Sequence, residues 1–265
     1  AVAGMEGVGT VAALGAGVEQ FAPGQQVVSL APVGTWQEYA IADADALMAV
    51  PGTLAPRDAA MLVANPTTAW LLLQEELKVE PGAWVLQNAA NSAVGYFVIQ
   101  LCRKLGYRSI NVVRRRDVVD DLRAAGADEV ICEADEDVVE RVRAITGGKG
   151  VPVVYDSVGK DTLEASLDSL QPRGSLVSNG TSSGPVVIDT MLLAVKGSIW
   201  VTRPAMVHYA TPRAQMLAMA DELFEHVLAG RIVGEPQQEF ALEEAADAHR
   251  ALESRRTTGA TVLTV

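Results

Sequence analysis

The sequence predicts an α/β fold in which a doubly wound parallel sheet is joined to a smaller β-rich lobe. Residues 67–206 alternate short buried strands with amphipathic helices, a pattern typical of a parallel sheet covered on both faces. Residues 1–66 instead contain short strands separated by Gly and Pro turns, which indicates an antiparallel region. Residues 207–265 add helices and strands after the α/β unit, and we expect this tail to return to the first lobe.

The elements follow in order along the chain. In the β-rich lobe we expect strands over 7–14, 27–30 and 36–42. In the α/β region the expected strands are 84–88, 109–113, 129–132, 151–156, 175–179 and 198–202, and the expected helices are 93–105, 118–125, 137–145 and 163–170. In the tail we expect helices over 213–228 and 242–252, and strands over 235–240 and 260–265.

Composition and charge exclude several classes of protein. The 265 residues are 49% hydrophobic and 20% charged, enough for a sizeable core and too apolar for a disordered chain. A net charge of −12 argues against nucleic acid or an anionic membrane as partner. Two cysteines exclude a disulfide framework. With neither a signal peptide nor an apolar run long enough for a membrane span, we expect a cytoplasmic protein.

The first strand–turn–helix unit of the sheet predicts a dinucleotide site of the Rossmann type. The usual fingerprint G-x-G-x-x-G is replaced here by residues 90–95, in which only Gly95 keeps a glycine. Ala90 and Ser92 are small enough for the backbone to approach a phosphate, and Asn91 or Ser92 is suited to cap the helix. An ordinary βα turn remains the alternative interpretation.

The end of the second strand indicates which dinucleotide binds. Arg114 follows Gly95 by 19 residues, and Arg115 and Arg116 come next, where an NAD enzyme carries an acidic residue. A carboxylate there would repel a 2′-phosphate, whereas guanidinium groups bind one. We therefore predict NADP(H) as cofactor; the alternative is a solvent-exposed arginine cluster.

These motifs together resemble the medium-chain dehydrogenase/reductase superfamily. Residues 4–9 resemble its G-H-E-x-x-G motif, and the turn at 23–27, the segment 36–40 and the run 146–151 also match its pattern. Within the superfamily, the mitochondrial-type 2-enoyl thioester (CoA/ACP) reductases are the most similar. The residues that resemble them are 65–69, 87–95, 110–114 and 199–201.

The resemblance implies a Rossmann NADP-binding domain plus a GroES-like catalytic lobe. Because the chain starts at the G-H-E-like motif, we expect that lobe to be incomplete and to lack the tyrosine thought to donate a proton; no catalytic residue is assigned. The motif's histidine is Met5 here, and the three histidines lie in the tail, so we expect the zinc-independent branch and no metal. By resemblance the residues around the cofactor are Asn88, Arg114, Arg115, Arg116, Asn179, Gly180, Thr181, Ser182, Ile199, Trp200 and Val201.

The implied activity is NADPH-dependent reduction of the C=C bond of a 2-enoyl thioester, with hydride added at the β-carbon and a proton at the α-carbon. Two alternatives remain open: a zinc-free NADPH:quinone or enone oxidoreductase, and a catalytically silent NADP-binding protein. The acidic net charge favours a CoA thioester or a small enone over the acidic acyl carrier protein. We also expect a homodimer paired near 199–202, since superfamily members often join their last strands edge to edge.

Overall fold

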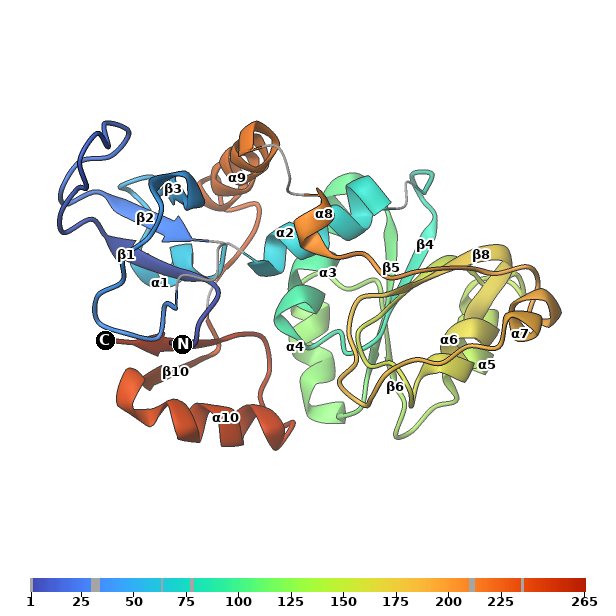
Figure 1. The fold of residues 1–265 in the computed structure, drawn as a ribbon. Coiled ribbons are helices and arrows are strands. Elements are labelled where there is room, and N and C mark those ends of the chain that lie inside the picture. The colour runs from blue at the N-terminus through green and yellow to red at the C-terminus, as the bar shows by residue number, and fades with distance from the viewer. Residues whose placement is uncertain (1, 30–33, 63, 77–78, 210–212, 235) are drawn as a thin grey trace. The chain divides into compact units, whose positions relative to one another are not determined.

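The structure is a computed structural model that describes residues 2–29, 34–62, 64–76, 79–209, 213–234 and 236–265. The chain folds as two compact units (Figure 1). Unit 1 joins residues 1–67 to residues 211–265, and unit 2 comprises residues 68–210.

Unit 2 is built on one parallel sheet, which confirms the predicted α/β class. Its six strands lie in the order β6-β5-β4-β7-β8-β9. Strands β5 and β6 are added on one side of β4, and β7, β8 and β9 on the other, so the strand order reverses between β4 and β7. Every adjacent pair is parallel, and all six strands therefore end at the same edge. The strands are β4 Trp84–Gln87, β5 Arg108–Val113, β6 Glu129–Cys132, β7 Val151–Asp156, β8 Leu170–Ser178 and β9 Trp200–Thr202.

Helices cover both faces of this sheet (Figure 1). Helices α3 (Ala93–Leu105) and α4 (Val119–Ala124) pack on one face, where Ile99 and Leu122 are fully buried. Helices α5 (Val138–Ile145) and α6 (Leu163–Ser169) pack on the other face through Val142 and Leu167. The central strands are buried on both sides, which is why β7 is a largely apolar run in the sequence, while β5 also buries the polar residues Ser109 and Asn111. The remaining helical segments of unit 2 are a π-helical turn at Leu71–Glu76, a 3-10 turn at Arg116–Val118, α7 Thr190–Val195 and α8 Met206–Tyr209.

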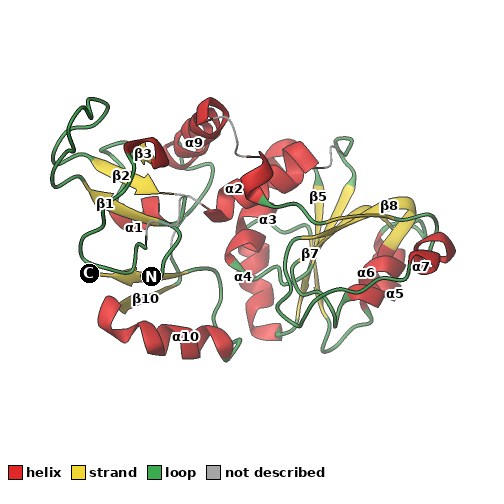
Figure 2. Ribbon diagram, in the orientation of Figure 1, coloured by secondary structure: helices red, strands yellow, loops and turns green. Residues whose placement is uncertain are grey.

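Unit 1 contains two small sheets (Figure 2). Strands β1 (Gly7–Thr10), β2 (Gln26–Ser29) and β3 (Leu47–Ala49) form an antiparallel meander, and β10 (Gln238–Ala241) pairs in parallel with β11 (Thr261–Thr264). Its helical segments are α1 Pro56–Ala60, α9 Arg213–Leu228, α10 Ala245–Glu253 and 3-10 turns at Ala44–Ala46 and Leu242–Glu244, while α2 Ala64–Trp70 crosses the division between the units.

One predicted strand is wrong. Residues 36–42 form a bend and extended chain with no strand partner among the described residues, and Tyr39 and Ile41 are 78% and 99% exposed. The alternating pattern there does resemble a strand, but a strand is stable only where a neighbouring chain satisfies its backbone. Residues 30 and 235, each at the end of a predicted strand, lie outside the described residues. In the part of the chain that the structure describes, no helix is both long and apolar enough to cross a membrane.

Candidate functional site

The carboxyl-terminal edge of the parallel sheet brings together the predicted polar residues of unit 2. Asn88 follows β4, Arg114 follows β5, Asp156 ends β7 and Asn179 follows β8. Ligands of open α/β sheets bind at this edge, at the point where the strand order reverses. The reversal lies between β4 and β7, so Asn88 and Asp156 flank it directly.

The turn after β4 has the features of a phosphate-binding turn although it lacks two of the usual glycines. Ser92 caps α3, and its Oγ accepts a hydrogen bond from the backbone N–H of Gly95 at 3.2 Å. A Cβ atom on Gly95 would lie 2.3 Å from the carbonyl oxygen of Ala90, so only glycine allows the helix to approach the turn this closely. Ala89 adopts a left-handed conformation with φ of 52°, which is costly for a residue with a side chain.

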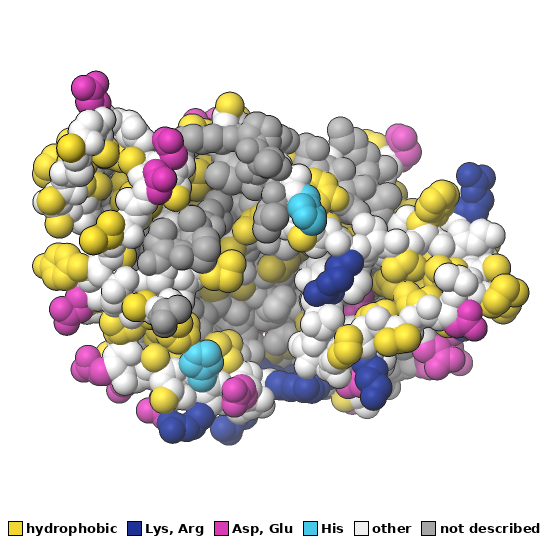
Figure 3. Space-filling view, in the orientation of Figure 1, with side chains coloured by type: hydrophobic (Ala, Val, Ile, Leu, Met, Phe, Trp, Pro, Cys, Tyr) yellow, Lys and Arg dark blue, Asp and Glu magenta, His cyan; other side chains and the backbone are white. Residues whose placement is uncertain are grey.

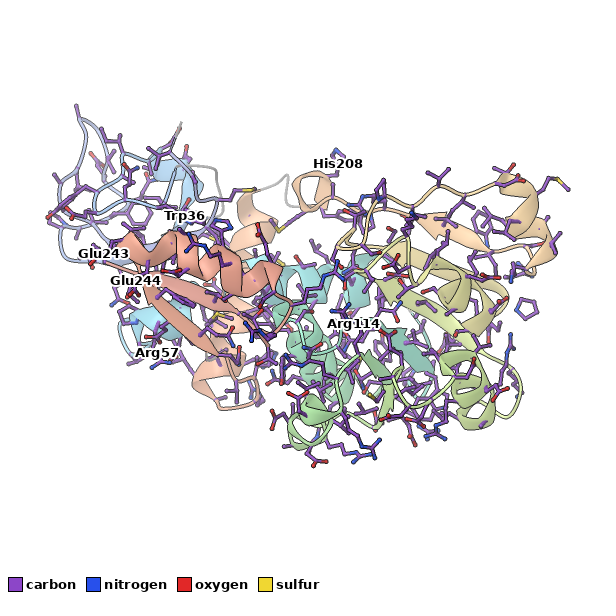
Figure 4. The ribbon with its side chains drawn as sticks, turned by 90° about the horizontal axis from the view of Figure 1, so that it is seen from below. Trp36, Arg57, Arg114, His208, Glu243 and Glu244 are labelled. Atoms are coloured by element: carbon purple, nitrogen blue, oxygen red, sulfur yellow. The ribbon has the colours of Figure 1, made fainter. Side chains whose placement is uncertain are left out.

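The three arginines after β5 differ in what they contact. Arg115 forms an ion pair with Asp117 at 3.2 Å, and Arg116 forms one with Asp135 at 2.7 Å. Arg114 is exposed and has no ion pair with any described residue (Figure 4). Its charge acts on Glu133, where burial raises the pKa of the carboxyl group and Arg114 opposes that rise. The structure therefore leaves Arg114 as the guanidinium available to an anion.

A buried carboxylate joins the ends of β4 and β7. Asp156 is 2% exposed, and its Oδ1 accepts hydrogen bonds from the backbone N–H groups of Val158 and Gly159, both at 2.9 Å. Its Oδ2 accepts from the hydroxyl of Ser166 at 2.6 Å, and Ser166 in turn accepts from Nδ2 of Asn88 at 2.9 Å. Sequence reasoning missed Asp156 and Ser166; an acid that ends a buried strand and precedes a loop glycine was the available signal.

The turn after β8 is held against the same carboxylate loop. The backbone N–H groups of Asn179 and Gly180 donate to the carbonyl oxygen of Asp156 at 2.9 Å and 3.2 Å. A Cβ on Gly180 would lie 2.3 Å from the carbonyl oxygen of Ser157, so the close approach requires glycine. Arg203, also missed from the sequence, donates to the carbonyl oxygens of Ser178 and Gly180 at 3.2 Å and 3.3 Å.

The strand residues predicted beside the cofactor lie on β9 or directly before it. Ile199 is 6% exposed within the core, whereas Trp200 and Val201 are 68% and 38% exposed on β9, the strand at one end of the sheet order. Thr202 pairs with Val177, so these residues come before the carboxyl edge rather than at it. Their contact with a cofactor stays a prediction, and their exposure suggests a different use.

Unit 1 holds an open cavity of about 1270 Å³. It is lined mainly by residues 4–15, 35–42 and 260–265. One aromatic pair at its wall is Trp36 and His249, whose ring centroids are 5.2 Å apart. Glu6, which also lines it, accepts a hydrogen bond from the backbone N–H of Ala64 at 2.9 Å, and burial raises the pKa of its carboxyl group.

The donor set of unit 2 fits a nicotinamide dinucleotide phosphate. The capped N-terminus of α3 offers backbone N–H groups and a positive dipole end for a pyrophosphate. Arg114 offers a charge for a terminal phosphate, and Oδ1 of Asn179 is a buried acceptor without a hydrogen-bond partner among the described residues, suited to an amide donor. The described residues contain no group of three His, Cys, Asp or Glu side chains placed to hold a metal ion.

Comparisons with known proteins agree with this geometry. Two family profiles match: "Alcohol dehydrogenase GroES-like domain" over residues 1–52 and "Zinc-binding dehydrogenase" over residues 93–222. A quinone oxidoreductase of Pseudomonas aeruginosa is 42% identical over 98% of this chain and 81% of its own length. A mitochondrial enoyl-[acyl-carrier-protein] reductase of Xenopus tropicalis is 33% identical over 97% of this chain and 75% of its own length. The crystal structure of Escherichia coli quinone oxidoreductase complexed with NADPH superposes with a TM-score of 0.95 at 37% identity, covering 99% of this chain and 82% of that one.

The fold and the site define a chain of the medium-chain dehydrogenase/reductase superfamily, and these relatives show that it belongs to the quinone oxidoreductase group of that superfamily. The expected superfamily is thereby confirmed. The expected subgroup is corrected, because the Pseudomonas aeruginosa quinone oxidoreductase is 42% identical over nearly the whole chain, whereas the Xenopus tropicalis enoyl reductase is 33% identical. The resemblance to the enoyl reductases was drawn from residues 65–69, 87–95, 110–114 and 199–201 alone, whereas the identity to the quinone oxidoreductase extends over 98% of the chain.

Proposed function

We propose that this protein is an NADPH-dependent reductase of quinones and small enones, with its cofactor at the carboxyl edge of the unit 2 sheet. The observation that carries the proposal is the end of β5, where the exposed Arg114 stands in place of the acidic residue of NAD enzymes. Two relatives support it, since the Escherichia coli quinone oxidoreductase and a mycobacterial protein of TM-score 0.93 were both solved with NADPH.

The residues of this chain have distinct parts in that proposal. The N-terminus of α3, capped by Ser92, holds the pyrophosphate, and Arg114 holds the 2′-phosphate. The turn 179–182, fixed by Arg203 and Asp156, holds the carboxamide end through its small polar groups. When bound there, NADPH supplies the hydride that reduces the substrate.

Enoyl thioester reduction is the second candidate. It is favoured by the resemblance of residues 87–95 and 110–114 and by the 33% identical enoyl reductase. The two substrates place different demands on the protein. A quinone that has accepted a hydride carries its negative charge on oxygen, which water protonates readily, whereas the thioester needs a proton delivered to carbon by a positioned acid. The quinone reaction therefore needs no positioned acid, and no such acid is among the residues assigned so far.

An assay of NADPH oxidation tests the proposal. The purified chain is mixed with NADPH and either a benzoquinone or crotonyl-CoA, with NADH as the matched control cofactor. We expect quinone-dependent oxidation that is faster than the crotonyl-CoA reaction and selective for NADPH. Faster oxidation with crotonyl-CoA would favour the thioester reductase. Binding of NADPH, seen as enhanced nucleotide fluorescence, without oxidation by either substrate would indicate a silent NADP-binding protein.

We further propose that unit 2 forms a homodimer through β9. Among the described strands β9 is the last of the sheet order and its outer edge has no partner, and exposed edges of this kind recruit another strand. Four large hydrophobic side chains on and near α7 and β9 are 66–86% exposed, more than a monomer usually leaves in one region (Figure 3). They are Val187, Met191, Val195 and Trp200. Pairing two copies edge to edge would complete the sheet and cover these side chains.

A further inference from the structure

The hydrogen bonds from Asp156 to Asn88 have a fixed direction. The backbone N–H groups of Val158 and Gly159 can only donate, so Oδ1 of Asp156 must accept from both. The carboxylate has no proton to give, and Ser166 must therefore spend its single hydroxyl proton on Oδ2 of Asp156.

This leaves the Ser166 oxygen as an acceptor for the next group in the series. Asn88 meets that demand with its NH2 group, whose Nδ2 lies 2.9 Å from the Ser166 oxygen. The amide oxygen of Asn88 is consequently on the side away from Ser166, and no described residue donates a hydrogen bond to it. The backbone of Asn88 is also fixed, because its N–H donates to the carbonyl oxygen of Tyr155 at 3.0 Å and its carbonyl accepts from Ser157 at 3.3 Å.

We infer that Asp156 is a positioning residue of the cofactor site: acting through Ser166, it makes Asn88 present an oxygen rather than an NH2 group to the nucleotide. This inference rests on the proposed function. A phosphate oxygen cannot be the partner of that oxygen, since both would be acceptors. The partner must be an uncharged donor of NADPH: the carboxamide N–H of the nicotinamide, a ribose hydroxyl or the adenine amine.

Replacing Ser166 by alanine removes the middle of this relay and frees the Asn88 amide to rotate. The expected result is a Kd for NADPH raised by about 2- to 10-fold, the range of one hydrogen bond that is no longer preorganised. The matched control is Thr162→Val, because the Thr162 hydroxyl also donates to Asp156, at 2.8 Å, without contacting Asn88. We expect that control to lower Tm by a similar amount and to change Kd by less than about 2-fold.

Asp156→Asn gives a sharper test because it should reverse the direction of the relay. The donors Val158 and Gly159 keep the oxygen of the new amide on their side, so its NH2 group faces Ser166. Ser166 then donates to Asn88, which must turn its oxygen inward and its NH2 group toward the nucleotide. We expect the affinity for NADPH to fall by about 10-fold or more, because Asn88 would then present its NH2 group to a donor group of the nucleotide.

The charge-conserving pair Asp156→Asn with Asn88→Asp keeps the reversed direction of the hydrogen bonds but restores an oxygen on the nucleotide side of residue 88. Residue 88 then accepts from Ser166 with one oxygen and offers the other to the nucleotide. We expect the pair to regain most of the affinity lost by Asp156→Asn alone. If Asp156 acted only by stabilising the fold, the added substitution Asn88→Asp would not restore NADPH affinity.

Fluorescence titration with NADPH and calorimetric titration with 2′-phospho-ADP-ribose, which lacks the nicotinamide, identify the donor. Loss confined to NADPH assigns the carboxamide, and equal loss for both ligands assigns a ribose hydroxyl or the adenine amine; either supports the inference. Equal effects of Ser166→Ala and Thr162→Val on Kd, or no recovery in the pair, would overturn it and leave the proposed function intact. A wild-type chain that binds no NADPH would overturn both.

Discussion

Replacing Arg114 by alanine should separate the two nicotinamide cofactors. Arg114 is exposed at the end of β5 and has no ion pair with any described residue, so its guanidinium is free to bind the 2′-phosphate that only NADPH carries. A hydrogen bond to a charged group contributes about 1.5–3 kcal/mol. At 1.4 kcal/mol for each factor of ten, Arg114→Ala is expected to raise the Kd for NADPH by about 10- to 150-fold.

The measurement is a fluorescence titration of wild type and variant with NADPH and with NADH at one salt concentration. We expect the Kd for NADH to change by less than about 2-fold, because NADH offers no 2′-phosphate to lose. Raising the salt concentration should weaken wild-type NADPH binding and leave the variant less affected, since exposed charges are screened.

Arg116→Ala is the matched control, because it removes the same charge from the same loop. The Arg116 guanidinium is engaged with Asp135 at 2.7 Å, and its loss should change the Kd for NADPH by less than about 3-fold. Equal losses for NADPH and NADH in Arg114→Ala would refute the assignment of the 2′-phosphate. Equal losses in the two arginine variants would show that the loop acts through its net charge alone.

Three further predictions follow from other contacts. Gly95→Ala puts a Cβ 2.3 Å from the Ala90 carbonyl oxygen, so thermal unfolding should show a loss of about 1–3 kcal/mol and titration a weaker NADPH affinity; an unchanged Tm would contradict the tight approach. Trp200→Glu places a charge on the exposed edge strand and should convert a dimer into a monomer in analytical ultracentrifugation, whereas a variant that stays dimeric would exclude β9 as the interface. Burial raises the pKa of Glu6, so its stabilising contribution is present below the unfolded pKa near 4.5 and is lost as pH rises through the higher folded value. In urea unfolding, the free energy of unfolding of Glu6→Gln should therefore rise relative to that of wild type between pH 4 and pH 7. A difference between the two free energies that does not change with pH would contradict the raised pKa of the buried carboxyl group.

The parallel sheet could be predicted because its strands are buried on both faces and each is followed by a helix with a recognisable start or stop. Asp137 caps α5 by accepting the N–H of Glu140 at 2.8 Å, and Gly106 ends α3 with φ of 74°. These are local signals, read within one turn of the chain. The strand predicted over 36–42 failed because pairing depends on a neighbour, which a local pattern does not report.

The candidate site was only partly predictable for the same reason. Position along the chain placed Arg114 at the strand end, yet the ion pair of Arg116 depends on where Asp135 folds, 19 residues further along the chain. Asp156 and Arg203 were missed because their roles depend on contacts with other elements, Ser166 on α6 for Asp156 and the end of β8 for Arg203. The subgroup was misjudged because a few matching residues around the cofactor outweighed similarity spread over the whole chain.

The contacts around Asp156 also determine when the site can form during folding. The Asn88–Ser166 hydrogen bond closes a loop of 78 residues, and Arg203 reaches back 25 residues to Ser178. Contacts so distant in sequence form late, after the strands between them have assembled. The site should therefore open before the rest of the sheet unfolds, and a nucleotide that binds only the closed form would protect these loops from proteolysis. Substitutions in the sheet core that touch no ligand should then weaken nucleotide binding by favouring the open form.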